Sequence, residues 1–346
     1  MKELLEKLSA LRGISGSEHK ISDAIMDMFK PYADEVYTDK IGNVIAVKKC
    51  GTKDAPKVMI EGHMDEIGLM VRDINENGFI GFVNIGGVDS RILPGGEVVV
   101  HGIRDIKGVI GAKPPHLQSA DDAKKAVDMT EMVIDTGLSV DQVKELVSVG
   151  DAVTVRGDFC TLLSGRVAGK SLDDRAGVAA LMKVIEALKD KKLNCDIYFV
   201  AAVCEEVGGR GAAVAGYSIK PDIAIAIDVT HGLTPDNSKN GFELGSGVAI
   251  AKGPNLHPEL TKRLIDIAKE KNIKYTVEVE GGDTGTDAWI LQVVDEGIAT
   301  ALLSIPLRYM HTTVETLDIA DVESLSNLIL EFLRGIDDNV EEWLCF

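Results

Sequence analysis

Three apolar stretches rich in β-branched residues, each followed by acidic or imidazole side chains, constrain the fold of this chain most strongly. They occur at 58–60, 196–203 and 222–227, and their composition is typical of buried strands. His63, Glu206 and Asp228 follow them in turn. We therefore expect these three polar side chains to lie at the ends of strands.

After Gly165 helical and strand patterns alternate, which predicts a mostly parallel sheet covered by helices. At the start of the chain, leucines recur at helical spacing, and Ser15 with Glu18 matches a capping box for a second helix. The fold class expected is therefore α/β. Beyond Gly165 we expect helices at 175–189, 257–271 and 319–333, and strands at 196–203, 222–227, 275–280 and 300–304.

The sequence pattern changes between residues 67 and 165. Short β segments are separated there by glycine-rich turns, and one helix is expected at 141–147. This pattern is typical of a small, mostly antiparallel β-barrel inserted into a larger α/β unit. A chain of 346 residues also favours two domains over one. We predict that 1–66 and 166–346 form the larger domain and that 67–165 form the insert.

Charge and composition narrow the choice of partners. The chain has 37 basic and 55 acidic residues, and a net charge of -18 repels nucleic-acid backbones and anionic membrane surfaces. It has no amino-terminal signal pattern and no apolar stretch of membrane-spanning length, so we expect a cytoplasmic protein without nucleic-acid or membrane partners. Its five cysteines are scattered without CxxC spacing, which argues against disulfides and thiolate zinc sites.

Two segments place potential metal ligands beside supporting carboxylates. In 62–65 (GHMD), His63 and Asp65 are two residues apart and would share one face of an extended segment, so that Asp65 orients the imidazole. A solvated turn histidine is the plainer interpretation of this triplet. In 172–177 (LDDRAG), Asp174 fits a helix cap, whereas Asp173 has no such structural explanation.

Glu205 and Glu206 are adjacent and directly follow a strand, so they either repel each other or share a cation. One can bind metal while the other serves as a general base. Taken alone, Asp228 and His311 would each be interpreted as ordinary loop residues. Together, two histidines and three carboxylates without thiolates suit Zn²⁺, Co²⁺ or Mn²⁺ in a two-metal hydrolase. This candidate ligand set is His63, Asp173, Glu206, Asp228 and His311.

The same residues carry a resemblance to a known family. The chain resembles, along nearly its whole length, the dinuclear-metal aminopeptidases that include the tetrahedral, deblocking and glutamyl aminopeptidases. The chain departs from the usual sequence pattern of this family at Cys204 and at 208–211 (GGRG), and neither departure falls on a candidate ligand. The motifs that carry the resemblance are 62–68 (GHMDEIG), 172–177 (LDDRAG), 205–208 (EEVG), 211–212 (GA), 228–230 (DVT), 285–288 (GTDA) and 308–311 (RYMH).

The resemblance implies a zinc exopeptidase-like catalytic domain interrupted by a β-rich oligomerisation domain, and two divalent metal ions, zinc or cobalt, per subunit. His63 and Asp228 would hold one ion, Glu206 and His311 the other, and Asp173 would bridge them. A water bridging the two ions would hydrolyse the N-terminal residue from peptides, with Glu205 as general base and Asp65 supporting His63. It also implies self-association into a tetrahedral dodecamer.

Two other functions remain open at this point. Some relatives have been labelled endoglucanases, and paired glutamates serve glycosidases, although sequence neighbours cannot easily straddle a sugar bond. The other is a non-enzymatic assembly protein braced by metal, for which the additional carboxylate of Glu205 has no use. The side chain preferred at the substrate N-terminus is not decided by the sequence.

Overall fold

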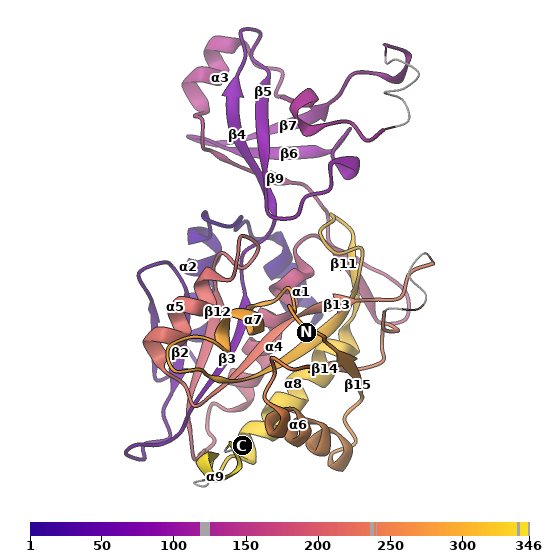
Figure 1. The fold of residues 1–346 in the computed structure, drawn as a ribbon. Helices are drawn as coiled ribbons and strands as arrows, with labels where there is room; N and C mark the ends of the chain where they lie inside the picture. Colours follow the sequence, from indigo (N-terminus) through magenta and orange to yellow (C-terminus); the bar gives the residue numbers. More distant parts are fainter. Residues whose placement is uncertain (118–124, 236–238, 240, 338–339, 345–346) are drawn as a thin grey trace.

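The computed structural model describes residues 1–117, 125–235, 239, 241–337 and 340–344. Its chain forms a larger α/β body and a smaller β body, which are stacked one above the other in Figure 1. The smaller body is built from residues between Gly68 and Val155, and the chain enters and leaves it at the same end.

The larger body is organised around four parallel strands in the order β12, β3, β13, β16. These are β12 (Asp196–Ala202), β3 (Lys57–His63), β13 (Ile223–His231) and β16 (Ala299–Arg308). The flanking pairs β1–β2, β2–β12, β14–β16, β16–β17, β11–β17 and β10–β11 are antiparallel, and the outer pair β14–β15 is parallel. The outer strands are β1 (Glu35–Thr38), β2 (Val44–Lys48), β10 (Cys160–Thr161), β11 (Arg166–Gly169), β14 (Val248–Lys252), β15 (Tyr275–Val279) and β17 (Glu315–Asp318).

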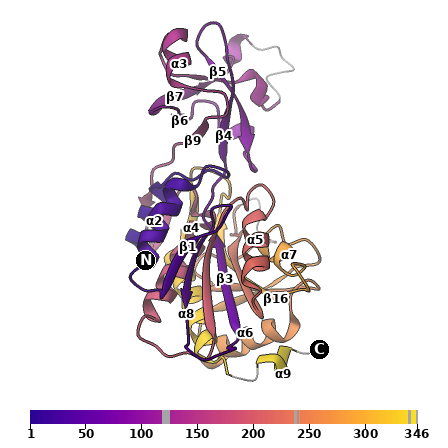
Figure 2. The ribbon, with the colours of Figure 1, turned by 90° about the vertical axis from the view of Figure 1, so that its left-hand side faces the viewer.

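Helices cover both faces of this sheet, as Figure 2 shows edge-on. Because side chains alternate along a strand, Val58 and Ile60 of β3 pack into one apolar cluster and Met59 into another. The first cluster includes residues of α1 (Lys2–Ala10), α2 (His19–Phe29), α4 (Leu172–Ala187), α6 (Pro258–Glu270) and α8 (Ile319–Arg334). The second includes residues of α5 (Arg210–Ile219) and α7 (Asp287–Leu291), while α9 (Val340–Leu344) lies near the C-terminus. The predicted helix-covered α/β sheet is thus confirmed.

The smaller body is a closed antiparallel barrel with its own apolar core, as the strand pattern predicts. Its strand β7 alternates exposed and buried residues along its length, which is the period-2 pattern of a strand with one face in the core. Helix α3 (Val140–Leu146) begins with a capping box in which Ser139 and Gln142 satisfy each other's backbone amides. The barrel strands are β4 (Gly68–Ile74), β5 (Ile80–Ile85), β6 (Glu97–His101), β7 (Asp105–Gly111), β8 (Val133–Asp135) and β9 (Ala152–Val155).

The structure differs from the sequence-based expectation at the start of α2. The predicted capping box of Ser15 and Glu18 is wrong: the helix begins at His19 and Glu18 is its N-cap residue. The Ser15 hydroxyl instead donates a hydrogen bond of 2.6 Å to Asp65 Oδ2, and the Glu18 carboxylate accepts the backbone N–H groups of Gly16 and Cys204. A buried acceptor elsewhere in the chain thus outcompetes the local cap.

Among the residues that the structure describes, no helix combines the length and the apolar character needed to cross a membrane.

Candidate metal centre

The candidate ligands lie at one edge of the central sheet. His63 is the last residue of β3, Asp228 lies in the C-terminal half of β13, and Glu206 follows β12. These three strands are parallel neighbours, so their carboxyl ends meet at the same edge. His311 follows β16, and Asp173 lies in the first turn of α4.

Asp173 stands between the two histidines. Its Oδ1 lies 3.1 Å from Nε2 of His63, and its Oδ2 lies 3.4 Å from Nε2 of His311. The Nε2 atom of His311 is also 3.3 Å from Oε2 of Glu206. Ligand atoms of His63, Asp173 and Glu206 all lie within 4.8 Å of one another. The two oxygens of the Asp173 carboxylate therefore face two different imidazoles.

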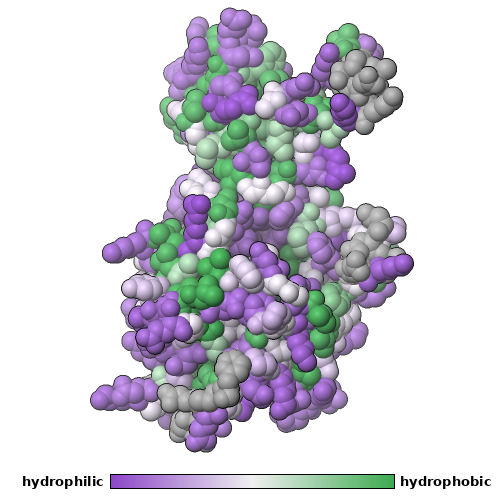
Figure 3. All heavy atoms as spheres, in the orientation of Figure 1, coloured by the Kyte–Doolittle hydropathy of each residue, from purple (hydrophilic) through white to green (hydrophobic). Residues whose placement is uncertain are grey.

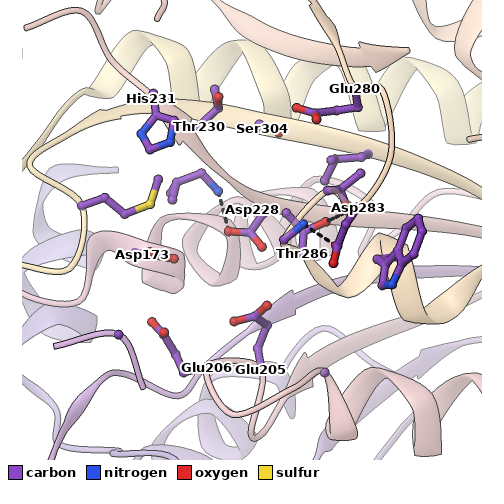
Figure 4. A pocket seen from close by; sticks show the side chains of 18 of the residues that line it. Asp173, Glu205, Glu206, Asp228, Thr230, His231, Glu280, Asp283, Thr286 and Ser304 are labelled. Atoms are coloured by element: carbon purple, nitrogen blue, oxygen red, sulfur yellow. Dashed lines mark hydrogen bonds between the residues drawn. The ribbon is translucent and has the colours of Figure 1, made fainter. Parts of the chain in front are cut away.

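Glu205 and Asp228 complete the polar wall around this group. Oε2 of Glu205 lies 3.9 Å from Nε2 of His63, and Figure 4 shows Glu205 and Glu206 side by side below Asp228 and Asp173. Asp228 is 5 % exposed, and its Oδ1 accepts the N–H of Val229 at 2.7 Å. The neighbour of Asp173, Asp174, has the structural role expected: its Oδ1 accepts the Gly177 N–H at 2.9 Å.

A second set of residues orients these side chains. Oδ1 of Asp65 lies 3.5 Å from Nδ1 of His63, and Asp65 also accepts the backbone N–H groups of Glu205 and Glu206. Asp65 therefore connects the ends of β3 and β12, while the hydroxyl of Ser15 holds it in place. Such outer partners fix the ring orientation of a metal-binding histidine.

Two further supports come from residues without a recognisable motif. The carboxylate of Glu315 accepts the backbone N–H groups of Asp173 and His311, at 3.1 and 2.9 Å. The carbonyl oxygen of Gly87, in the segment that joins β5 to β6 of the barrel, lies 3.1 Å from Nδ1 of His311. The smaller body therefore contacts the candidate centre directly. The only local sign of this contact is the glycine pair 86–87, which leaves room for Glu206 and His311.

The backbone at this edge adopts conformations that non-glycine residues rarely take. Ser171, Cys204 and His311 have φ values of 58°, 57° and 60°. Left-handed non-glycine residues cost of order 1–3 kcal/mol each and gather at functional sites. Here they lie two residues before Asp173, directly before Glu205, and at His311 itself, so the turns that aim these side chains are the strained ones.

Burial shapes the protonation of the site. Burial raises the pKa of Asp228 well above its usual value, raises that of Glu205 to about 10, and raises that of Glu206. Burial would lower the pKa of His63, but hydrogen bonds with Asp173 and Asp65 raise it well above its usual value. Hydrogen bonds with Asp173 and Glu206 raise the pKa of His311 to about 11. Burial therefore disfavours the charged form of these carboxylates, and imidazoles together with carboxylates form a donor set that suits divalent cations.

A cavity of about 810 Å³ opens beside this group. Its wall includes Asp173, Glu205, Glu206, Asp228 and His311, and it extends over β15 and the segment leading to α7. It is large enough for the end of a peptide.

The family becomes clear from the match of residues 42–328 to the family model of M42 glutamyl aminopeptidases. The chain belongs to the M42 aminopeptidase family. A lysyl aminopeptidase of Pyrococcus furiosus is 40% identical to it over 344 residues, which cover 97% of this chain and 98% of the relative. The expected family is therefore confirmed, and with it the aminopeptidase and peptide hydrolase character of the chain.

Solved structures agree with this assignment. A TET aminopeptidase from a marine sediment Thaumarchaeota archaeon superposes with a TM-score of 0.93 at 31% identity, covering 99% of this chain and 98% of the other. The TET1 peptidase of Pyrococcus horikoshii, which can assemble into a tetrahedron or a large octahedral shell, gives 0.86 at 33% identity, covering 96% and 99%. A protein of Thermotoga maritima described as an endoglucanase gives 0.80 at 32% identity and covers 99% of both chains.

Proposed function

We propose that this M42 aminopeptidase removes the N-terminal residue of peptides at a centre that binds two divalent cations. His63 and Asp228 would hold one, Glu206 and His311 the other, and Asp173 would contact both. The observation that carries the proposal is the position of Asp173, whose two carboxylate oxygens lie close to two different histidines. Zinc or cobalt suits these ligands.

Cations bound here would acidify a water molecule and polarise the scissile carbonyl. Glu205 would take the proton of that water, because its Oε2 lies 3.9 Å from Nε2 of His63 and the residue lines the same cavity. After taking this proton, Glu205 would pass it to the leaving amine. Asp65 positions His63 through Nδ1 and does not meet the substrate.

The variant Glu205→Gln tests this division of roles. We expect it to retain two metals per chain, measured by plasma mass spectrometry, and to lose most turnover on aminoacyl anilides. The matched variant Glu206→Gln should lose metal as well as turnover. Full activity of Glu205→Gln would refute the base assignment, and full metal content of Glu206→Gln would refute its assignment as a ligand.

The glycosidase alternative is less consistent with the contacts of Glu206. A glycosidase needs two free carboxyl groups that flank a sugar bond roughly 5 to 9 Å apart. Glu206 is instead engaged with His311 at 3.3 Å. Release of reducing sugar that persists in a chelator would establish the glycosidase instead. Measuring metal content beside anilide hydrolysis likewise separates an enzyme from a metal-braced assembly protein.

We further propose that residues 1–66 and 166–346 form the catalytic domain and that the inserted domain, residues 67–165, mediates self-association into a tetrahedral dodecamer. On the barrel, Ile103 is 81 % and Val149 68 % exposed, and Figure 3 shows hydrophobic residues on the barrel face turned to the viewer. Light scattering of the intact chain tests this, since a monomer at micromolar concentration would refute it. The expected cytoplasmic location stays a prediction, which imaging of a tagged chain tests.

A further inference from the structure

The wall of the cavity away from the candidate metal ligands carries three more carboxylates. Glu278 lies in β15, Glu280 directly follows this strand, and Asp283 lies in the segment leading to α7. Residues two apart along a strand point to the same side, so Glu278 and Glu280 approach the cavity together. Figure 4 shows Glu280 across the pocket from Glu205 and Glu206, with Asp228 between them.

No cationic side chain balances these carboxylates along the cavity. Among the described residues that line it there is neither lysine nor arginine, and its two histidines are His231 and His311. Burial raises the pKa of Glu280, which His231 partly offsets, and burial also raises the pKa of Glu278. A positively charged group entering this part of the cavity would relieve the cost of keeping these carboxylates charged.

Hydrogen bonds hold two of these three carboxylates in place. The Thr230 hydroxyl donates a hydrogen bond to Oε1 of Glu278, which anchors that carboxylate to β13. Oδ1 of Asp283 accepts the backbone N–H of Gly285 at 2.9 Å. Glu280 has neither kind of anchor among the hydrogen bonds described, so its carboxylate keeps the most capacity to accept donors from a ligand.

Apolar side chains line the same cavity. Trp289, Ile290, Leu302 and Met310 contribute to its wall, and Trp289 is 38 % exposed. An aliphatic stem can pack against such residues while its charged end reaches a carboxylate. An indole face adds attraction for a cation. The chemistry of the cavity is therefore that of a long side chain with an apolar stem and a positive tip.

Resting on the proposed aminopeptidase function, we propose that Glu280 and Asp283, with Glu278 behind them, select peptides whose N-terminal residue is lysine or arginine. These carboxylates receive the charged end of the substrate side chain, and Trp289 flanks its stem. The α-ammonium group, which every N-terminus carries, stays at the end of the cavity beside the metal ligands. These residues thus determine specificity and take no part in bond cleavage.

The test compares Lys, Arg, Leu and Glu p-nitroanilides with the metal-loaded full chain. We expect kcat/KM for the Lys and Arg substrates to exceed that for the Leu substrate by about tenfold or more, because charge-assisted hydrogen bonds are worth about one to two factors of ten. In Glu280→Gln/Asp283→Asn, kcat/KM for Lys should fall about 10- to 100-fold more than for Leu. The charge-reversal variant Glu280→Lys should shift preference toward the Glu substrate. Glu323→Gln, an exposed carboxylate on α8 outside the cavity, is the matched control and should leave all rates unchanged.

Three results would overturn the proposal in distinguishable ways. An equal loss on the Lys and Leu substrates in the double variant would show that these carboxylates recognise the α-ammonium group. A wild-type preference for Leu or Glu would refute the selection while leaving the aminopeptidase intact. Absence of release from every substrate by the metal-loaded wild type would refute the proposed function and the selection with it.

Discussion

Replacing Gly87 by alanine should disturb the candidate metal centre from the barrel side. A Cβ atom at Gly87 would lie 2.6 Å from Nδ1 and 2.9 Å from Cε1 of His311, whereas ordinary contacts begin at 3.4 Å. The imidazole must therefore move by about 0.8 Å, the difference between 3.4 and 2.6 Å. The φ angle of Gly87 is not positive, so alanine adds no backbone strain there.

A displacement approaching 1 Å at a reacting group can cost about 100-fold in rate. Disturbing an outer partner of a ligand typically costs about 10- to 100-fold in metal affinity or activity. We therefore expect Gly87→Ala to lower metal affinity or kcat/KM by about 10- to 100-fold, or about 1.4 to 2.7 kcal/mol, with little change in the free energy of unfolding.

The assay is a metal titration followed by anilide hydrolysis at each occupancy. Gly111→Ala is the matched control, because a Cβ there would meet only the Val133 carbonyl at 4.0 Å. Wild-type metal affinity and turnover in Gly87→Ala would refute the reasoning, since they would show that His311 does not depend on this contact.

Other predictions concern buried charges. Replacing Glu66 by glutamine should destabilise the fold by about 3–5 kcal/mol, measured by urea unfolding, because the variant loses the carboxylate that pairs with the buried Arg175 and the partly buried Lys170. Oε2 of Glu66 lies 2.7 Å from Lys170 Nζ, and its Oε1 lies 3.6 Å from Arg175 Nη2. Burial would raise the pKa of Glu66, but Lys170 and Arg175 lower it. The stabilisation that the charged carboxylate gives the fold is therefore complete above the ordinary pKa of 4.5 and is lost as pH falls through the lowered value, so the wild type should lose more stability below pH 4.5 than Glu66→Gln. Parallel curves of stability against pH for the two proteins would contradict this. Metal binding to the chelator-stripped protein near pH 7 should release protons, because the raised pKa values of His63 and His311 keep both rings charged until a cation binds. Calorimetry in buffers of different ionisation enthalpy measures this proton release. Binding heats that do not depend on the buffer would exclude it. Without metal, the stabilising effect of charged His311 is complete below pH 6.5 and is lost as pH rises through about 11.

Local patterns were enough to predict the sheet and the gathering of polar residues at its edge. The strands that carry His63 and Asp228 are buried at all but one residue each, so their apolar composition identifies them, and parallel packing then brings their carboxyl ends together. The helical spacing of apolar residues in α6 and α8 was equally informative.

The helices and strands that the sequence analysis did not predict have weak local sequence signals. Helix α5 follows two glycines with positive φ and contains small residues, which gives little amphipathic contrast. Strands β11 and β17 are four residues long and gain their stability by pairing with each other across the sheet. The contacts of Ser15 with Asp65 and of Gly87 with His311 join residues 50 and 224 positions apart, so no sequence window contains both partners.

The wide spacing of the candidate ligands along the chain also bears on when the protein can acquire its cations. His63 is made early in synthesis and His311 near the end, and between them come the whole barrel and three of the four central strands. A nascent chain released only as far as β13 carries the carboxylates but lacks the last imidazole. Loading of the complete proposed pair must therefore wait until β16 has left the ribosome and joined the sheet.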